Sequence, residues 1–404
     1  MKKYFAVWAP FLVAGLFACQ QPAEPPESEV EVSLEQKAQE LAQQILIVDT
    51  HIDVPYRLEE KWEDISQRTE SGDFDYPRAK AGGLNVPFMS IYIPAEHQKT
   101  GDAKQVADGL IEMVEKFAAD WPDKFAIATS VDDVKSQFSE GKISLAMGME
   151  NGAPIGDDLA NLEHFYTRGI RYITLAHSEW NQISDSSYDP ERKWNGLSDF
   201  GREVVVAMNG LGVMVDVSHI TDEAFFQVME LSQAPVIASH SSCRHFTPDW
   251  ERNMSDEMIQ QLALNGGVIQ INFGSSFLSG DYQKAMDKLR TYAEEHSIDL
   301  DSEDGKRLRR ERGIDYADVA DVVAHIDHVV QMVGIDHVGL GSDFDGVGDS
   351  LPTGLKDVSY YPNLIHQLLE KGYTEEDVEK ICSGNLPRVW SEVERIAKEL
   401  QSVE

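Results

Sequence analysis

Short runs of apolar and β-branched residues alternate with longer amphipathic segments along most of the chain. Runs of this length between turn residues predict strands, whereas apolar residues that recur every three or four positions predict helices. Their alternation is typical of βα units around a parallel sheet, and eight strands favour an α/β fold of the (β/α)8 TIM-barrel type. The predicted strands are residues 45–50, 86–93, 143–149, 172–176, 213–217, 236–239, 268–272 and 338–342.

Helices are predicted between these strands, at residues 103–119, 159–168, 200–209, 222–231, 255–264 and 317–333. Thr221 and Ser255 are suitable N-cap residues, and Gly210 and Gly334 can end a helix. The segment 279–312 is too long and too charged for a simple loop, so we expect a helical insertion or lid after the seventh strand. Because no second composition regime follows, residues 34–404 are predicted to form one barrel domain.

The N-terminus has the pattern of an export signal. Lys2 and Lys3 precede an apolar stretch, residues 4–18, that is too short to span a bilayer comfortably. Its end resembles a bacterial lipobox, which predicts a signal peptide over 1–19 and lipidation of Cys19; a plain secretory signal or an uncleaved anchor is the alternative. Residues 20–33 are rich in Pro, Glu and Ser and suit a tether. We therefore expect a lipid-anchored protein of the bacterial cell envelope, facing the periplasm or the exterior.

Composition and charge narrow the function. The 404 residues are 42% hydrophobic and 26% charged, which is a globular composition. With 35 Lys and Arg against 70 Asp and Glu, the net charge of -35 argues against nucleic-acid binding. The three cysteines match no metal-binding spacing, so a metal would need His and carboxylate ligands. Cys243 and Cys382 could pair or stay buried and reduced.

Residues suited to metal binding or proton transfer follow nearly every predicted strand. In a barrel these positions converge on the mouth formed by the carboxyl ends of the strands. Six strands supplying one site would be hard to obtain by chance, so we expect an active site there. The residues are His51, Asp53, Glu150, His177, His219, His240 and Asp343.

Five of these residues are candidate metal ligands. His51 and Asp53 are two positions apart, so in strand geometry both side chains point the same way and can bind one cation. Glu150 directly follows a buried strand and has two oxygens with which to bridge two metals, although a solvated loop acid is the alternative. His219 and His240 end two successive strands and favour a second site, although each alone would also suit a core histidine.

The other candidates have roles in proton transfer and substrate binding. Asp343 lies among small residues and is a candidate proton carrier near a metal-activated water, with Asp345 as the alternative acid. His177 could be a further ligand or a donor to a polarised carbonyl oxygen. Arg252 precedes a predicted helix and could either bind a substrate carboxylate or form a structural ion pair.

These residues occur in stretches that together resemble the membrane dipeptidase family, also called renal dipeptidase or peptidase family M19. The resemblance runs from about Val48 to Trp390. The matching stretches are VDTHID at 48–53, GMENG at 148–152, RYITLAH at 171–177, DVSH at 216–219, SHSS at 239–242, RNM at 252–254 and GSDFDG at 341–346.

The resemblance implies a barrel of the metal-dependent hydrolase kind with two zinc ions. His51 and Asp53 would hold one ion, His219 and His240 the other, and Glu150 would bridge them. It further implies that Asp343 moves the proton, that His177 contacts the substrate near the scissile carbonyl and that Arg252 binds its terminal carboxylate. The reaction would be attack of a metal-bridging hydroxide on a dipeptide, and the protein would form a homodimer.

Two stretches depart from the family pattern. Residues 178–187, after His177, differ from the usual sequence, and Asn151 stands where glycine is common. Both lie near the predicted mouth, so they bear on the choice of dipeptide, which includes L-Xaa-L-Xaa and L-Xaa-D-Xaa, rather than on the metals. Alternatives are another metal-dependent amidohydrolase, acting on a cyclic amide, β-lactam, lactone or phosphotriester, or a non-catalytic peptide-binding lipoprotein. No strand end offers a lysine to be carbamylated, which disfavours many amidohydrolases, and a binding protein would not need Asp343.

Overall fold

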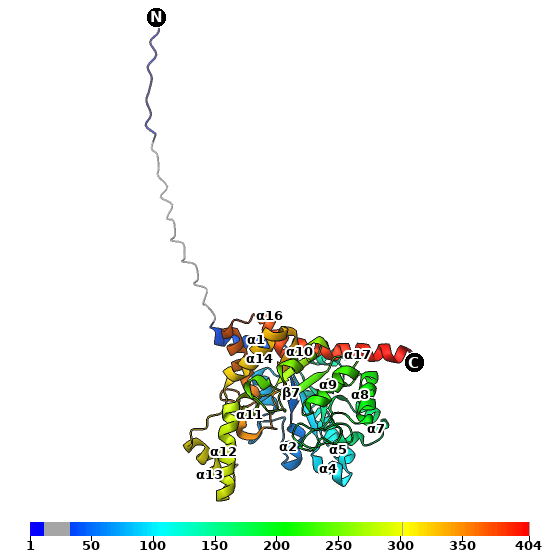
Figure 1. Cartoon of the computed structure of the whole chain (residues 1–404). Helices are drawn as coiled ribbons and strands as arrows, with labels where there is room; N and C mark the ends of the chain where they lie inside the picture. The colour runs from blue at the N-terminus through cyan, green and yellow to red at the C-terminus, as the bar shows by residue number, and fades with distance from the viewer. Residues whose placement is uncertain (12–32, 301, 404) are drawn as a thin grey trace. The chain divides into compact units, whose positions relative to one another are not determined.

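The computed structural model describes residues 1–11, 33–300 and 302–403 (Figure 1). The chain divides by its internal contacts into Met1–Ser33 and Leu34–Glu404, and the second unit contains every element discussed below. Cys19, with much of the predicted signal peptide and tether, lies outside the described residues. Among the helices of the described part, none is both long and apolar enough to cross a bilayer.

Eight parallel strands form a nearly closed barrel, in which neighbours in the sheet are also successive in the chain. The first and last strands meet at the carboxyl end, where Ile52 and Phe344 form a parallel bridge. There the Asp53 amide donates to the Phe344 carbonyl over 2.9 Å, and the Asp343 amide donates to the His51 carbonyl over 3.0 Å. The strands are β1 (Val48–Ile52), β2 (Val86–Tyr92), β4 (Ile143–Glu150), β5 (Ile170–Thr174), β6 (Met214–Asp216), β7 (Ile237–Ser241), β8 (Val268–Ile271) and β9 (Val338–Leu340).

The predicted α/β barrel and its eight strands are confirmed, with small shifts at the ends. The first strand begins at Val48 rather than at residue 45, because α1 (Leu34–Gln44) extends close to it. A further strand, β3 (Phe125–Ile127), was not predicted; it has only three residues and pairs with β4 alone.

Helices cover the outside of the barrel, and the six predicted helices are present. Thr221 caps α9 as expected, accepting a hydrogen bond from the Ala224 amide. Gly210 was wrongly expected to end a helix: α8 continues through it and ends at Gly212, whose φ of 87° is left-handed. The helices are α1, α2 (Val54–Glu60), α3 (Tyr76–Gly82), α4 (Ala95–Thr100), α5 (Ala103–Asp120), α6 (Val131–Ser139), α7 (Ala160–Thr167), α8 (Asp199–Leu211), α9 (Asp222–Leu231), α10 (Asp256–Leu264), α11 (Ser275–Leu278), α12 (Gly280–His296), α13 (Glu303–Glu311), α14 (Val319–Val333), α15 (Tyr361–Lys371), α16 (Glu375–Glu379) and α17 (Asn385–Val403).

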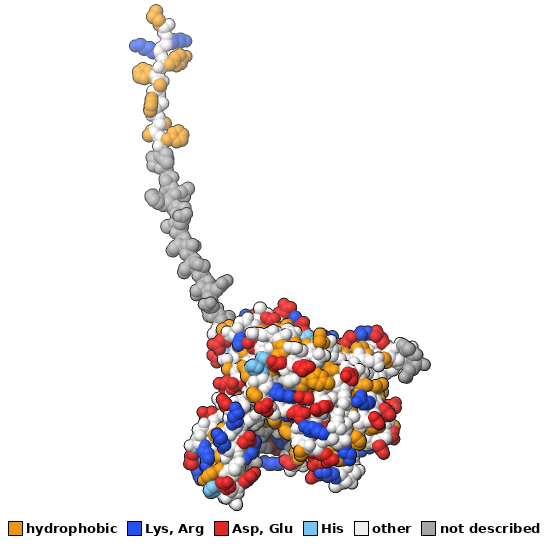
Figure 2. Space-filling model, viewed as in Figure 1, with side chains coloured by type: hydrophobic (Ala, Val, Ile, Leu, Met, Phe, Trp, Pro, Cys, Tyr) orange, Lys and Arg blue, Asp and Glu red, His pale blue; other side chains and the backbone are white. Residues whose placement is uncertain are grey.

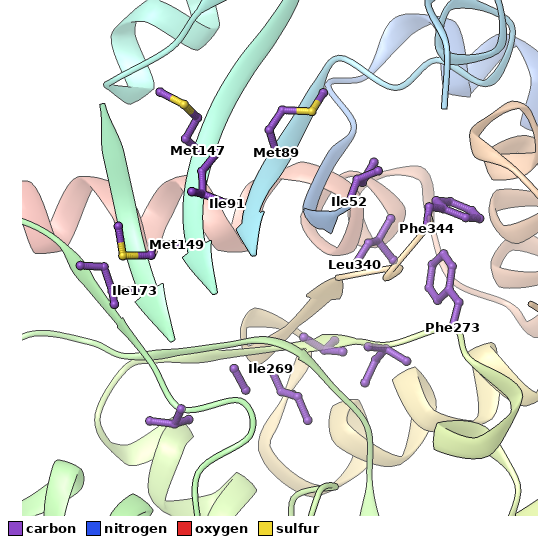
Figure 3. Packing of buried hydrophobic residues seen from close by; sticks show 14 of the residues in the cluster. Ile52, Met89, Ile91, Met147, Met149, Ile173, Ile269, Phe273, Leu340 and Phe344 are labelled. Atoms are coloured by element: carbon purple, nitrogen blue, oxygen red, sulfur yellow. The ribbon is translucent and has the colours of Figure 1, made fainter. Parts of the chain in front are cut away.

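Successive side chains of a strand point to opposite faces of the sheet. One set therefore packs between the sheet and the outer helices, and the other set packs inside the barrel. On β4, Met147 and Met149 face the helices, in the large cluster that Figure 3 shows in part. Ala146 belongs instead to the cluster inside the barrel, where Trp390 of α17 packs 5.5 Å from Phe88 between ring centroids. Because α17 contributes to this inner cluster, the barrel interior is a packed core, and its open positions lie at the carboxyl ends of the strands.

The predicted insertion is a pair of helices, α12 and α13, beside the barrel (Figure 1). It has a small apolar cluster of its own around Leu289 and Ile314. Acidic side chains are spread over the visible face of the molecule, and basic side chains gather on this pair of helices (Figure 2). Among the residues that the structure describes, Cys243 and Cys382 are both buried and form no disulfide, so the two do not pair with each other.

Candidate metal centre and active site

Candidate residues from six strand ends meet at the mouth of the barrel. They border a cavity of about 300 Å³, which we call the catalytic cavity. His51 and His240 lie deeper, with their rings stacked 3.7 Å apart between centroids. The residues lining the catalytic cavity are Asp53, Tyr56, Tyr92, Glu150, His177, Tyr188, His219, Phe277, Asp343, Asp345, Gly346 and Val347.

Glu150 lies at the centre of this cluster, and its two carboxylate oxygens face different imidazoles. Oε2 is 3.4 Å from His51 Nε2. Oε1 is 3.0 Å from His219 Nε2 and 3.2 Å from His240 Nε2. Burial opposes ionisation, but the surrounding histidines, His51 foremost, hold the pKa of Glu150 well below its usual range. An ionised carboxylate therefore lies between two groups of possible ligands.

The donor set fits divalent cations. His219 Nε2 and His240 Nε2 are 2.7 Å apart, and burial keeps the pKa of both rings well below the usual value, so two neutral imidazoles point at one another and at Glu150. On the other side, buried His51 Nε2 and Asp53 Oδ1 have no hydrogen-bond partner. Burial disfavours a charged His51, yet Tyr172, Glu150 and Asp53 raise its pKa well above the usual value. The same negative field favours a metal cation.

Groups behind the ligands fix their orientation. His51 Nδ1 is 2.8 Å from the Tyr172 hydroxyl, which donates to the Thr50 carbonyl over 2.9 Å. The hydroxyl must therefore accept from Nδ1–H, which leaves the Nε2 lone pair directed at the site. Gly148 makes room for this tyrosine, because a Cβ at that position would lie 1.9 Å from the Tyr172 ring.

In the pair formed by His219 and His240, the His240 ring is oriented by a similar chain of hydrogen bonds. His240 Nδ1 is 2.7 Å from Ser239 Oγ, which donates to Asp216 Oδ2 over 2.6 Å. This chain again puts the ring proton on Nδ1 and leaves Nε2 as a ligand. His219 adopts a left-handed backbone with φ of 71°, an uncommon conformation for a non-glycine residue that turns the chain at the end of β6.

Asp343 has the surroundings expected of a proton carrier. Its Oδ2 accepts a hydrogen bond from Asn272 Nδ2 over 2.7 Å. Burial, together with the negative charges of Asp53 and Glu150, raises the pKa of Asp343 to about 7. A carboxyl group with such a pKa can both accept and return a proton near neutral pH.

The alternative acid, Asp345, is occupied by structural contacts. Its Oδ2 accepts from Arg57 Nε over 3.1 Å, and its Oδ1 accepts from the Asp73 amide over 2.6 Å. Although Asp345 lines the catalytic cavity, both of its oxygens hold the loop after α2 against the last strand end. The geometry favours Asp343 as the mobile proton site.

His177 lies on the wall of the catalytic cavity. Its Nε2 is 3.4 Å from Glu150 Oε1, and its ring centroid is 4.2 Å from that of His219. Its Nδ1 is buried without a hydrogen-bond partner. Burial lowers the pKa of His177, so the ring is neutral at neutral pH and can carry a proton on Nε2 toward the cavity.

Arg252 is buried and does not line the catalytic cavity. Its Nη2 lies 2.9 Å from His219 Nε2 and 2.8 Å from the His240 carbonyl oxygen, and its Nε has no hydrogen-bond partner among the described residues. Tyr188 is a neighbour of Arg252: burial raises the pKa of Tyr188, and the charge of Arg252 and a hydrogen bond with it lower this pKa. The structure places Arg252 beside His219 and His240, and the sequence did not indicate that Tyr188 is its neighbour.

Sequence reasoning missed several residues that complete the site. Tyr172 and Asn272 point inward from strands and contact His51 and Asp343, and no local pattern distinguishes them from other strand residues. The alternation on β8 offered one signal, because Asn272 has the same parity as buried Gln270. Tyr188 lies in the long loop after β5, and no periodic pattern in that loop predicts which of its residues reach the site.

A parallel barrel with imidazoles and carboxylates at its carboxyl-end mouth defines the class of metal-dependent barrel hydrolases. The family model described as membrane dipeptidase (peptidase family M19) matches residues 35–404. This chain belongs to the membrane dipeptidase family and is a hydrolase of that family.

Individual relatives agree with the family match. Dipeptidase aclJ of Aspergillus oryzae is 34% identical over 336 residues, covering 81% of this chain and 72% of its own length. The crystal structure of the probable dipeptidase PvdM from Pseudomonas aeruginosa has a TM-score of 0.79 at 30% identity, covering 90% of this chain and 99% of that one. A metallopeptidase from Rhodobacter sphaeroides, bound to a phosphinate mimic of the dipeptide L-Ala-D-Ala, has a TM-score of 0.72 at 26% identity, covering 86% and 99%.

Proposed function

We propose that this protein is a dinuclear zinc dipeptidase that hydrolyses L-Xaa-L-Xaa and L-Xaa-D-Xaa dipeptides. The observation that supports it most directly is the position of Glu150, with one oxygen toward His51 and the other toward His219 and His240. In this proposal His51, Asp53 and Glu150 hold one ion, and Glu150, His219 and His240 hold the other. The R. sphaeroides relative, with its mimic of an L,D dipeptide, supports tolerance of a D-residue.

The chain's own residues then have defined tasks. Two bound cations would lower the pKa of a water and polarise the scissile carbonyl. Asp343 accepts the proton of the attacking water on its carboxylate and returns it to the nitrogen of the leaving amine. His177 donates from Nε2 to the carbonyl oxygen, where negative charge develops. No covalent bond between protein and substrate is needed.

Arg252 is proposed to bind the terminal carboxylate of the dipeptide. His219 Nε2 cannot bind a metal and accept a hydrogen bond from Arg252 at the same time, so metal binding releases one guanidinium N–H. The partnerless Nε supplies another donor. The two guanidinium N–H groups can then donate charge-assisted hydrogen bonds to the substrate carboxylate. The substrate must pass Tyr188 to reach them.

The test is a hydrolysis assay of the purified full-length chain on L,L and L,D dipeptides, with and without a chelator. Dipeptide hydrolysis that a chelator abolishes and zinc restores is the expected result. Hydrolysis only of β-lactams, cyclic amides or other amidohydrolase substrates would replace the dipeptidase assignment. Dipeptide binding without turnover would make the chain a binding protein.

Tyr172→Phe should weaken metal binding by about 10- to 100-fold, because His51 loses the partner that fixes its tautomer and ring orientation. Competition of the protein with a chromogenic zinc chelator measures this affinity. Tyr373→Phe is the matched control, since the Tyr373 hydroxyl donates to Asp327 outside the barrel. Equal zinc affinity of the Tyr172→Phe and control variants would remove Tyr172 from the account.

Arg252→Ala should raise KM for free dipeptides by about 10- to 100-fold, the value of a lost charge-assisted contact. C-terminally amidated dipeptides have no carboxylate, so their KM should change much less. Steady-state kinetics on matched pairs of free and amidated dipeptides measures both KM values on the same preparation. A similar rise for both substrates would show that Arg252 acts by supporting His219 and His240 instead.

We further propose that the chain is exported and anchored in the cell envelope by a lipid on Cys19, and that it forms a homodimer. Both proposals come from the N-terminal pattern and the family resemblance. Cys19→Ser should release the protein from the membrane fraction, and retention there would contradict the anchor. Sedimentation at the mass of one chain would contradict the dimer.

A further inference from the structure

A second cavity opens directly beside the catalytic cavity. It has a volume of about 480 Å³, and we call it the side groove. Tyr188, Phe277 and Val347 line both cavities, so these three residues form a shared border rather than a thick wall. The catalytic cavity, at about 300 Å³, is at the lower limit for small-molecule sites, so a dipeptide with a large side chain needs space beyond it.

The border lies on the side of the site where Arg252 is found. The Arg252 guanidinium carbon is 5.0 Å from the centroid of the Phe277 ring, and Tyr188 is close enough for Arg252 to act on its pKa. This step rests on the proposed function: if Arg252 binds the terminal carboxylate, the Cα of the C-terminal residue lies at this border. A side chain on that atom is then adjacent to the side groove.

One wall of the side groove is aromatic and apolar and suits an apolar or aromatic group, whereas the rest of the lining is polar or charged: Ser276, Gln283, Asp287, Arg290 and Ser350. The Trp250 and Phe277 rings meet edge to face at 5.0 Å between centroids, and Tyr188 meets Trp250 in the same manner at 6.3 Å. Tyr282 and Met286 complete an apolar wall. Aromatic pairs of this geometry and a polarisable thioether favour a further ring among them. The charged groups Asp287 and Arg290 form an ion pair with each other at 2.9 Å.

The insertion supplies much of this wall. Tyr282, Gln283, Met286, Asp287 and Arg290 all come from α12 and recur at the spacing of one helix face. The same face continues to Leu289, which packs with Tyr282 and Ile314 in the small apolar cluster of the insertion, and Met286 packs against that cluster. The segment that the sequence predicts as a helical insertion or lid therefore borders the side groove with a continuous face.

We propose that the side groove binds the side chain of the substrate's C-terminal residue and makes the enzyme selective for dipeptides ending in a large apolar or aromatic residue. The pocket is built by α12 together with Trp250 and Phe277. For a site that distinguishes side chains by apolar contact alone, selectivity of about 10- to 200-fold is expected.

The test compares kcat/KM for Ala-Ala with that for Ala-Phe on the full-length metal-loaded enzyme, using both enantiomers of the C-terminal residue. The better Ala-Phe substrate should exceed Ala-Ala by about tenfold or more. Met286→Trp fills the side groove and should remove this preference, because kcat/KM for Ala-Phe should fall much more than kcat/KM for Ala-Ala. Lys288→Trp, an exposed position on the same helix away from the groove, is the control and should keep the preference.

A second variant guards against a folding defect. Met286→Ala removes contacts without adding bulk, and it should reduce the preference for Ala-Phe several-fold at a temperature where the variant is folded. A wild-type enzyme that hydrolyses Ala-Ala and Ala-Phe equally well, or a preference that both Met286 variants retain, would overturn the side-groove assignment alone. Absence of any dipeptide hydrolysis by the wild type would overturn the proposed function itself.

Discussion

Glu150→Gln should lose both metal ions and hydrolyse dipeptides at least about 10³-fold more slowly than the wild type. The amide keeps the shape of the side chain but removes the negative charge that faces the imidazoles on both sides. Metal ions contribute several kcal/mol to stabilising the charge that develops during hydrolysis, which corresponds to a rate factor of this size. Elemental analysis and steady-state kinetics on the same preparation measure both effects.

Glu163→Gln is the control for this substitution, because Glu163 is exposed on α7 and outside the site. It should keep the wild-type metal content and activity. Metal binding stabilises only the folded chain, so Glu150→Gln should also lose the rise in melting temperature that added zinc gives the wild type. A Glu150→Gln chain with two tightly bound metals would contradict the bridging role.

Asp343→Asn should keep both metals and lose about 10²- to 10⁴-fold in kcat, the range expected when a general acid–base group is removed. Asparagine is of similar size and can still contact Asn272, but it cannot take a proton from water. Metal content and single-turnover rates distinguish a proton carrier from a metal ligand at this position. Loss of metal in this variant would make Asp343 a ligand, which its position near His51 and Asp53 also allows.

Asp345→Asn is the informative comparison for Asp343. Its carboxylate contacts Arg57 and the Asp73 amide, so the substitution should lower the melting temperature and reduce kcat much less than Asp343→Asn does. A larger fall in kcat for Asp345→Asn, at a temperature where both variants are folded, would reverse the assignment of the two acids.

The architecture could be predicted because each of the eight barrel strands is an apolar run of sufficient length and six of them are followed by polar residues of the candidate site. His51, Glu150 and Asp343 stand out in the sequence since a charged or imidazole side chain directly after a buried strand needs a partner. Convergence then follows from the barrel, where all strand ends meet at one mouth. The short strand β3 lacks such a signal and was missed.

The supporting residues could not be predicted, because their roles depend on contacts between distant segments. Tyr172 orients His51 across 121 residues of chain, and only the closure of the barrel, with β2 and β4 between β1 and β5, brings the two side chains together. Gly148 is an ordinary small residue in the sequence, and its role becomes visible only opposite the Tyr172 ring. Tyr188 joins the catalytic cavity to the side groove from a loop without periodicity.

We propose that two metal ions flank Glu150. The metal content of the purified full-length wild-type protein tests this proposal most directly. Elemental analysis after equilibration with limiting free zinc should give two zinc ions per chain, each removed by a chelator together with the activity. One ion per chain at full activity would contradict the bridged pair, and full activity without any bound metal would contradict the metal centre altogether.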